Sequence, residues 1–400
     1  MCDLYGEIMA VFDTPQYVKQ TLEKLMKSGY TAYLVGGCVR DAVIGRHVHD
    51  WDIATSASPG DVSRLFTKAF KTGEKFGTVT VLTPEGKVEV TTFRIEGSYL
   101  DGRRPESVEF VSCLDEDLSR RDFTMNAMAV SIDEVLTDPF GGLEDIKNRV
   151  IRCVGDPDKR FGEDALRMFR AYRFSAELGF LIERETQHAI YANADKARFI
   201  SAERIHVELE KTLLSQRPEV AGEMIGAGLL GSFVTSCRVA LEKLTELPAE
   251  PMLRWCAFCA ILQGAGGIAS ASAFLRGLKL DRATVKSCAD ALTIPDFPTG
   301  RTGIKRLIAT HGVNAIRCAA AANEALSGVP ALARVDEVIG SGECCSLKDM
   351  AVSGGDLIYI GHPPGKELGK TLDKLLEHVI EFPGDNDREV LLSFVTENKI

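Results

Sequence analysis

Residues 33–44 read YLVGGCVRDAVI, and this stretch decides the fold of the first part of the chain. The first three residues predict a short buried strand, the glycine pair predicts a tight turn, and the rest predicts a helix that runs to Ile44. A strand, a glycine turn and a helix start direct backbone N–H groups and the helix dipole at a phosphate, and Arg40 adds a charged donor. Taken alone, the same pattern is also typical of a purely structural turn.

Residues 49–54, HDWDIA, add acidic side chains to this element. The strand period of two places Asp50 and Asp52 on one face. Adjacent like charges on a strand are unfavourable unless a cation lies between them, so the pair is a candidate Mg²⁺ site. In residues 87–91, KVEVT, the same alternation separates Glu89 from two valines and offers a third acid. Three acids beside a glycine turn favour two-metal phosphoryl chemistry, whereas an isolated D-x-D pair is more often an exposed edge or turn.

The chain changes character near residue 150. Before it, short segments rich in β-branched residues alternate with helical patterns; these segments are 31–35, 51–54, 78–82, 88–93 and 108–111. After it, apolar residues recur at spacings near 3.6 without clear strands, as in residues 166–178. The sequence therefore predicts an α/β head followed by an all-α body.

Composition excludes several classes of protein. With 47 Lys plus Arg against 57 Asp plus Glu, the net charge of −10 argues against a histone-like protein that binds nucleic acid by bulk charge, so phosphate binding must be local. The longest apolar run, residues 255–262, is far too short to span a bilayer, and the first residues do not resemble a secretory signal, which predicts a cytoplasmic location. Eleven irregularly spaced cysteines predict reduced thiols, with Cys256 and Cys259 in a helix core rather than a zinc site.

Five segments occur in a fixed order, namely LVGGCVRDAVIG (34–45), HDWDIATSASP (49–59), RRDFTMNAMAV (120–130), DPFGGLEDI (138–146) and FGEDALRMFRAYRF (161–174). Together they resemble the class II CCA-adding tRNA nucleotidyltransferases and bacterial poly(A) polymerases. The resemblance implies an α+β fold: a nucleotidyltransferase head with a mixed β-sheet and helices, followed by an all-α neck, body and tail. It also implies Mg²⁺ as cofactor, with Asp50 and Asp52 as metal ligands. The nucleotide contacts that it implies are Gly37, Arg40, Arg121, Asp164, Arg167, Arg170 and Arg173.

Loop-rich breaks at 295–303 and 341–355 suggest further boundaries. We expect a catalytic head at 1–150, a neck for base recognition at 151–215, a body at 216–335 and a tRNA-binding tail at 336–400. The segment DPFGG (138–142) reads as a turn or hinge between head and neck. In the tail, three lysines spaced every four residues from Lys366 favour a solvated helix face over an RNA contact.

The acid and the arginines of residues 161–174 suggest how the enzyme selects a nucleotide base. On one helix, Asp164, Arg167 and Arg170 would present an acceptor edge and a donor fork from adjoining turns. Cytosine and adenine carry an amino donor beside a ring acceptor and match this pair. Guanine and uracil carry the reverse, and the mismatch should cost roughly a few kcal/mol. The alternative is a surface ion pair between Asp164 and Arg167.

A helix predicted from Phe123 to Met128, with Asp122 as its N-cap, would place Arg121 at a helix N-terminus suited to a phosphate or ribose. A solvated basic pair is the alternative reading of Arg120 and Arg121. In contrast, residues 226–231 fit G-x-G-x-x-G but follow a predicted helix, so we interpret them as a helix end and turn.

Together with these patterns, the family resemblance implies an enzyme that adds C, C and A to tRNA 3′ ends from CTP and ATP. Asp50, Asp52 and Glu89 would be its catalytic acids, and we expect no membrane or obligate protein partner. The alternatives are a poly(A) polymerase, a CC-adding or A-adding enzyme, and a non-catalytic RNA-binding protein. The lack of a long basic C-terminal extension argues against the first of these alternatives. Residues 97–105, GSYLDGRRP, predict a loop that is either a mobile lid near the triphosphate or an ordinary solvated hairpin loop. The family resemblance implies a flexible loop at this place in members that add the full CCA end.

Overall fold

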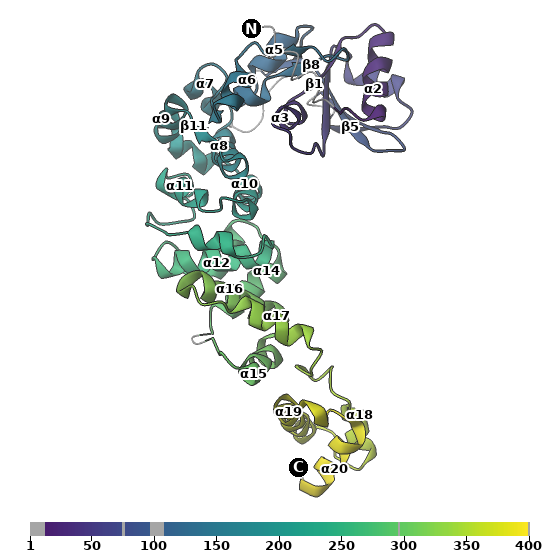
Figure 1. Ribbon diagram of the computed structural model, residues 1–400, viewed down its shortest axis with the longest axis vertical. Helices are drawn as coiled ribbons and strands as arrows, with labels where there is room; N and C mark the ends of the chain where they lie inside the picture. The colour runs from purple at the N-terminus through teal and green to yellow at the C-terminus, as the bar shows by residue number, and fades with distance from the viewer. Residues whose placement is uncertain (1–12, 74–76, 97–107, 295–296, 399–400) are drawn as a thin grey trace. The chain divides into compact units, whose positions relative to one another are not determined.

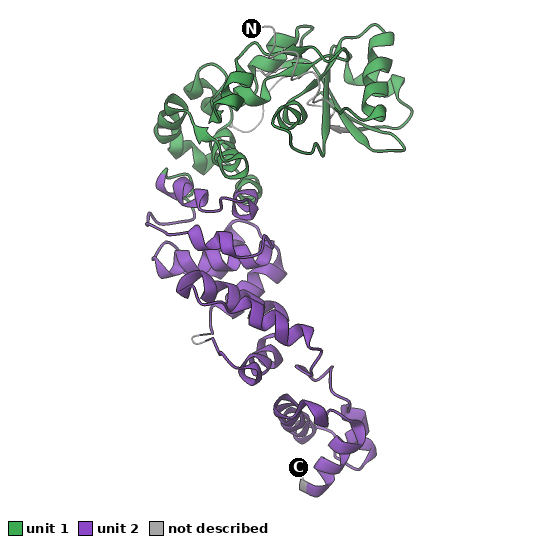
Figure 2. Cartoon of the chain, viewed as in Figure 1, with its two compact units in different colours: residues 1–208, 227–232 green, residues 209–226, 233–400 purple. Residues whose placement is uncertain are grey.

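The computed structural model describes residues 13–73, 77–96, 108–294 and 297–398. The chain divides into two compact units, shown in Figures 1 and 2. Unit 1 consists of residues 1–208 and 227–232, and unit 2 of residues 209–226 and 233–400. The lid predicted at residues 97–105 lies outside the described residues. The division into head, neck, body and tail stays a prediction.

Unit 1 contains a seven-stranded sheet with the order β3-β4-β5-β2-β1-β8-β9 (Figure 1). Its central strand, β2 (Trp51–Thr55), is antiparallel to β1 (Ala32–Val35) and parallel to β5 (Lys87–Thr92). The other strands are β3 (Ala69–Gly73), β4 (Thr78–Leu82), β8 (Ala129–Val130) and β9 (Leu136–Thr137). The α+β class with a mixed sheet, expected from the sequence, is confirmed.

Burial of alternate positions orients the acids of the central strands. Ile53 in β2 and Val88 and Val90 in β5 are fully buried. Because side chains alternate across a strand, burial of these apolar residues turns Asp52 and Glu89 to the opposite side. The hydrophobic pattern of the sheet thus fixes where the two carboxylates point.

The helices of unit 1 surround the sheet and continue beyond it. They are α2 (Gln16–Lys27), α3 (Gly37–Val43), α4 (Pro59–Leu65), α5 (Leu114–Ser119), η2 (Thr124–Asn126), α6 (Gly142–Lys147), α7 (Pro157–Glu163), α8 (Leu166–Leu178), α9 (Arg184–Asn193), η3 (Ala194–Phe199) and the first part of α10 (Ala202–Leu214). Two short strand pairs complete the unit, β6 (Arg94–Glu96) with β7 (Val108–Phe110) and β10 (Val150–Ile151) with β11 (Leu181–Ile182). The segment after residue 150 is therefore not purely helical, contrary to the prediction. A strand of only two residues, such as β11, is too short for a period of two to be recognised in the sequence.

Two helices differ from the prediction. The helix expected at 123–128 is only the single turn η2, and Asp122 does not cap it. Phe123, Met125 and Ala127 are all fully buried, so the segment crosses the core and has no solvent face to support a helical period. Asp164 is also not on one helix with Arg167 and Arg170, because it ends α7 with extended backbone and precedes α8.

Unit 2 is helical throughout its described residues. Its elements are the rest of α10, α11 (Val220–Gly226), η4 (Glu242–Glu246), α12 (Pro251–Gly264), α13 (Ala271–Gly277), α14 (Arg282–Ala291), α15 (Arg301–His311), α16 (Val313–Ser327), α17 (Leu332–Gly340), α18 (Gly354–Tyr359), α19 (Lys366–Glu381), η5 (Pro383–Asp385) and α20 (Arg388–Asn398). Helix α11 ends at Gly226, which agrees with the interpretation of residues 226–231 as a helix end and turn. Lys366, Lys370 and Lys374 of α19 are exposed, as a solvated helix face requires. Helix α12 is buried almost all round because it packs against α13, α14 and α16. None of the described helices is both long and apolar enough to cross a membrane.

Candidate active site

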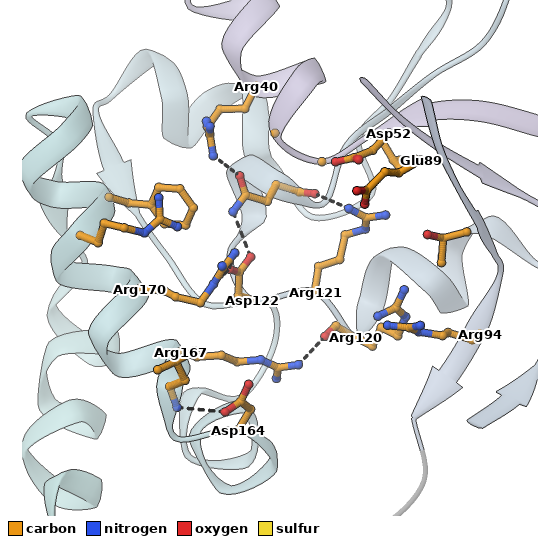
Figure 3. Close-up of a pocket in the computed structure, with 18 of the residues that line it drawn as sticks. Arg40, Asp52, Glu89, Arg94, Arg120, Arg121, Asp122, Asp164, Arg167 and Arg170 are labelled. Atoms are coloured by element: carbon orange, nitrogen blue, oxygen red, sulfur yellow. Dashed lines mark hydrogen bonds and ion pairs between the residues drawn. The ribbon is translucent and has the colours of Figure 1, made fainter. Parts of the chain in front are cut away.

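A cavity of about 530 Å³ opens in unit 1 beside the glycine turn and the central strands (Figure 3). Its charged lining comprises eight arginines and four carboxylates, namely Arg40, Arg94, Arg120, Arg121, Arg167, Arg170, Arg173, Arg204, Asp52, Glu89, Asp122 and Asp164. The surplus of positive charge contrasts with the net charge of −10 of the whole chain. An anionic ligand is therefore attracted to this cavity more than to the rest of the acidic protein surface.

Asp52 and Glu89 lie side by side because β2 and β5 pair in parallel with these two residues in register. The pKa of Asp52 is raised to about 6, mainly by burial and also by the negative charges of Glu89 and Asp50, against the opposing charge of Arg121. Carboxylates crowded in this way repel one another and supply the oxygen ligands that hard divalent cations prefer.

Asp50 occupies a different position from Asp52. It precedes β2, its side chain is 69% exposed, and its carboxylate pairs with the ammonium of Lys87 at 3.1 Å. It is absent from the described lining of the cavity, although its charge reaches Asp52. In this structure the closest partner of Asp52 along the sheet is Glu89 rather than Asp50.

The glycine turn allows an arginine to approach the acids. Gly36 has a φ of 77°, a conformation that favours glycine, and its backbone begins α3. A Cβ atom built at Gly36 would lie 2.8 Å from Nη1 of Arg121 and 3.9 Å from Oδ2 of Asp52. The absence of a side chain at this position is thus what lets the Arg121 guanidinium sit next to Asp52, as Figure 3 shows.

A buried acid that sequence analysis missed holds this guanidinium. Asp117 accepts hydrogen bonds from Arg120 at 2.7 and 3.0 Å and from Arg121 at 3.1 Å. Burial would raise the pKa of Asp117, but the charges of the two arginines outweigh burial and keep that pKa below its ordinary value. Arg121 also donates to the carbonyl of Asn126 at 3.4 Å. Arg121 is therefore fixed on two sides, which is not the solvated basic pair of the alternative reading.

Asn126 links arginines from two ends of the cavity. Its Oδ1 accepts from Nη1 of Arg40 at 2.8 Å, and its Nδ2 donates to Oδ1 of Asp122 at 3.0 Å. The other oxygen of Asp122 accepts from Arg170 at 2.7 Å from Nε and at 2.6 Å from Nη2. Burial would raise the pKa of Asp122, but the charge of Arg170 and these hydrogen bonds hold it well below its usual range. Hydrogen bonds thus connect Arg40 through Asn126 to Asp122 and Arg170; Figure 3 labels Arg40, Asp122 and Arg170.

Three of these arginines also stack on one aromatic ring. The guanidinium carbons of Arg40, Arg170 and Arg173 lie 4.9, 5.3 and 3.9 Å from the ring centre of Phe174. Arg173 additionally pairs with Glu208 at 2.6 Å and with Glu177 at 2.7 Å. Phe174 was not singled out from the sequence, where it reads only as one apolar position of α8.

Asp164 and Arg167 both line the cavity, and the backbone N–H of Arg167 donates to the backbone carbonyl of Asp164 at 3.0 Å. Asp164 accepts from the N–H of Leu166 at 3.0 Å and from Nη2 of Arg204 at 2.7 Å. Arg167 donates to Glu163 at 2.7 Å and to the carbonyl of Arg120 at 2.8 Å. The side chains of Asp164 and Arg167 are thus held by different partners, Arg204 for the acid and Glu163 for the arginine, and both line the cavity. Sequence analysis did not identify Arg204, which belongs to α10.

The comparisons with known proteins bear on the whole chain. The curated CCA-adding enzyme of Geobacillus stearothermophilus is 37% identical over 385 residues, which cover 94% of this chain and 95% of that protein. The chain belongs to the CCA-adding enzyme family. Like the other members of this family, it is a nucleotidyltransferase, and nucleotidyltransferases generally use a divalent metal.

Family models and solved structures agree with this membership in the CCA-adding enzyme family. Residues 32–152 match the Poly A polymerase head domain, residues 179–233 the RNA and SrmB binding site of polymerase A, and residues 250–395 the tRNA nucleotidyltransferase domain 2. The crystal structure of the Bacillus stearothermophilus CCA-adding enzyme in complex with CTP has a TM-score of 0.80 at 33% identity, covering 96% of this chain and 97% of that one. The Thermotoga maritima CCA-adding enzyme complexed with tRNA shares the fold at 20% identity and a TM-score of 0.67, covering 98% of each chain.

Proposed function

We propose that this chain adds C, C and A to the 3′ ends of tRNA, taking CTP and ATP as substrates and releasing pyrophosphate without a nucleic-acid template. The observation that carries the proposal is the arginine-rich cavity beside Asp52 and Glu89, in a chain whose relatives are CCA-adding enzymes along nearly their full length. We further propose a cytoplasmic location, where tRNA and both nucleotides are present.

We propose Mg²⁺ as the metal, held by Asp52 and Asp50 with Glu89 as the third acid. The raised pKa of Asp52 fits this role: it reflects burial first and then the nearby charge of Glu89, and a bound cation would offset both. When bound, the ion lowers the pKa of the attacking 3′-hydroxyl and balances charge on the departing pyrophosphate. The exposed position of Asp50 leaves it accessible from solvent at the start of the strand, where its present partner is Lys87.

The remaining residues bind and orient the nucleotide. The glycine turn at Gly36 and Gly37 opens α3, and Arg121 stands fixed beside it, so this part of the cavity suits the triphosphate. Arg40 and Arg170, which are connected through Asn126 and Asp122, offer further N–H donors for the phosphates or the ribose. The 3′-hydroxyl of tRNA then attacks the α-phosphate, the new P–O bond forms, and the bond to pyrophosphate breaks.

Base selection is proposed for Asp164 and Arg167. One carboxylate oxygen of Asp164 accepts from Arg204, and the other accepts from the backbone N–H of Leu166. It can therefore receive the amino group of cytosine or adenine while Arg167 donates to the neighbouring ring nitrogen. Guanine and uracil would place a carbonyl against Asp164, and an unpaired buried acceptor costs about 1–3 kcal/mol.

The test is a tRNA extension assay with the purified chain. tRNA that lacks its 3′ CCA end is incubated with CTP alone, with ATP alone and with both, each with Mg²⁺ and with a chelator. We expect addition of two C residues with CTP alone, a complete CCA end with both nucleotides, and no product with the chelator. Open-ended A addition with ATP alone would instead indicate a poly(A) polymerase, and absence of any extension would contradict the proposed function.

A further inference from the structure

Three cysteines meet in unit 2, and none of them lines the candidate active site. Cys256 lies on α12, Cys288 on α14 and Cys318 on α16, and their sulfur atoms all lie within 4.8 Å of one another. All three side chains are fully buried. The cluster exists because α12, α14 and α16 pack against each other in one helical unit.

The cluster is not the C-x-x-C pair visible in the sequence. Cys259 is as fully buried as Cys256 and lies one turn further along α12, but it is not part of the group of three. Sequence analysis correctly placed both residues in a helix core. It could not show that α14 and α16, which lie far along the chain, each bring one more thiol to Cys256.

The thiols interact with each other and with one carbonyl. The S–H groups of Cys288 and Cys318 are 3.9 and 3.8 Å from the carbonyl oxygen of Met252. Hydrogen bonds from Cys256 and Cys288 lower the pKa of Cys318, while those thiols themselves have raised pKa values. The three sulfur atoms are close enough to share one ligand, and each thiolate formed among them would add negative charge to a buried place.

The charge balance of the surroundings decides which ligand suits such a site. Arg317 is next to Cys318, but its guanidinium already pairs with Glu250 at 2.7 Å and with Asp336 at 2.8 Å. Three thiolates carry three negative charges, so a complex with a monovalent ion would keep a net charge of −2, and a complex with a divalent ion would keep a net charge of −1. A trivalent ion would leave none, and burial penalises only charged complexes.

We propose that Cys256, Cys288 and Cys318 form a binding site for a soft trivalent thiophilic element, with trivalent arsenic as its simplest representative. Arsenous acid, As(OH)₃, would react with three thiols to give a neutral tris-thiolate and three water molecules. Three As–O bonds break and three As–S bonds form, each thiol proton leaves with a hydroxide, and no oxidation state changes. Zinc fits less well, because a structural zinc site takes four ligands and the group in the described residues offers three.

The product would join three helices of unit 2 by one covalent centre. Cross-links of this kind stabilise a fold when its geometry is already in place, and a ligand that binds only the folded state does the same by mass action. Because the thiols are buried, arsenic must enter through local opening of the packed helices, so binding should be slow.

The experiment uses the full-length chain, reduced and then incubated with sodium arsenite. Native mass spectrometry measures how many arsenic atoms bind and how many hydrogen atoms they replace, and thermal unfolding is followed with and without arsenite. We expect one arsenic per chain that replaces three hydrogens, together with a higher unfolding temperature. Cys256→Ala should weaken arsenic retention on the order of 10–100-fold or more, a range seen when even an outer partner of a metal ligand is removed.

Cys259→Ala is the matched control, because it removes an equally buried thiol from the same helix without touching the group of three. It should keep the bound arsenic and the rise in unfolding temperature. If Cys256→Ala does not fold, Cys318→Ser provides the same test with a smaller change in volume. Replacement of only two hydrogens, equal loss in Cys259→Ala, or tighter retention of Cd²⁺ than of arsenic by the same three thiols would each overturn the proposal.

Discussion

Replacing Gly36 with alanine tests whether the position of Arg121 matters for nucleotide addition. The added Cβ would lie 2.8 Å from Nη1 of Arg121, so the guanidinium must move. Moving it breaks the hydrogen bonds at 3.1 Å to Asp117 and at 3.4 Å to the carbonyl of Asn126. Because the obstructed atom is the end of a flexible side chain, the loss should appear in activity more than in stability.

The expected magnitudes follow from two separate effects. An alanine held at a φ of 77° and a ψ of −133°, a combination that residues other than glycine rarely adopt, strains the backbone by about 1–3 kcal/mol. Loss of one charge-assisted contact from Arg121 to the nucleotide is worth about 1.5–3 kcal/mol, which corresponds to a drop of about tenfold to a hundredfold in kcat/KM. The assay measures C incorporation into tRNA that lacks its CCA end, over a range of CTP concentrations.

Gly45 provides the matched control at the other end of the same helix. Its φ is 71°, and a Cβ atom built there meets nothing within 4 Å. Gly45→Ala should therefore lose some stability through its own positive φ but keep normal activity, because its Cβ displaces no side chain. Stability can be read for unit 1 alone, because the chain has two tryptophans and Trp255→Phe leaves only Trp51, in β2. Equal kcat/KM values for the two alanine variants would refute the role of Gly36 in placing Arg121.

Three further predictions concern other parts of the site. Asp52→Asn should abolish incorporation yet stabilise the metal-free protein at pH 7 more than at pH 4. The pKa of Asp52 is about 6 in the folded protein against an ordinary value of 3.8. The stability due to protonated Asp52 is therefore complete below about pH 4 and is lost as pH rises through 6, whereas asparagine stays neutral at both pH values. Melting curves at both pH values check this, and an equal shift at each would contradict it. Asp164→Ala should reduce the preference for CTP and ATP over UTP and GTP, and Arg204→Met should do so to a smaller extent because Arg204 only orients Asp164, as competition assays with mixed nucleotides can measure. Deleting residues 98–104, which lie outside the described residues, should leave C addition largely intact but impair the terminal A, and an unchanged ratio of A to C incorporation would remove the lid hypothesis.

The sequence by itself determined the elements whose structure depends only on residues close together in the chain. The strand, glycine turn and helix of residues 33–44 form as predicted because each step depends only on local propensity and on the freedom of glycine. The alternation in β5 correctly turned Glu89 away from its buried valine neighbours. The five ordered segments likewise identified the family, since they preserve residue types and spacings along the chain.

Only the tertiary structure decided which distant side chains meet. The parallel register of β2 and β5 makes Glu89 the neighbour of Asp52, and no local period contains that register. Asn126 connects Arg40 with Asp122 because its segment crosses the core, where the local pattern suggested a helix. Asp164 finds its partner in Arg204 on another helix, and three helices of unit 2 bring their cysteines together. Contacts of this kind depend on how elements pack and pair, so they follow from the free energy of the whole fold and not from the spacing of residues along one element.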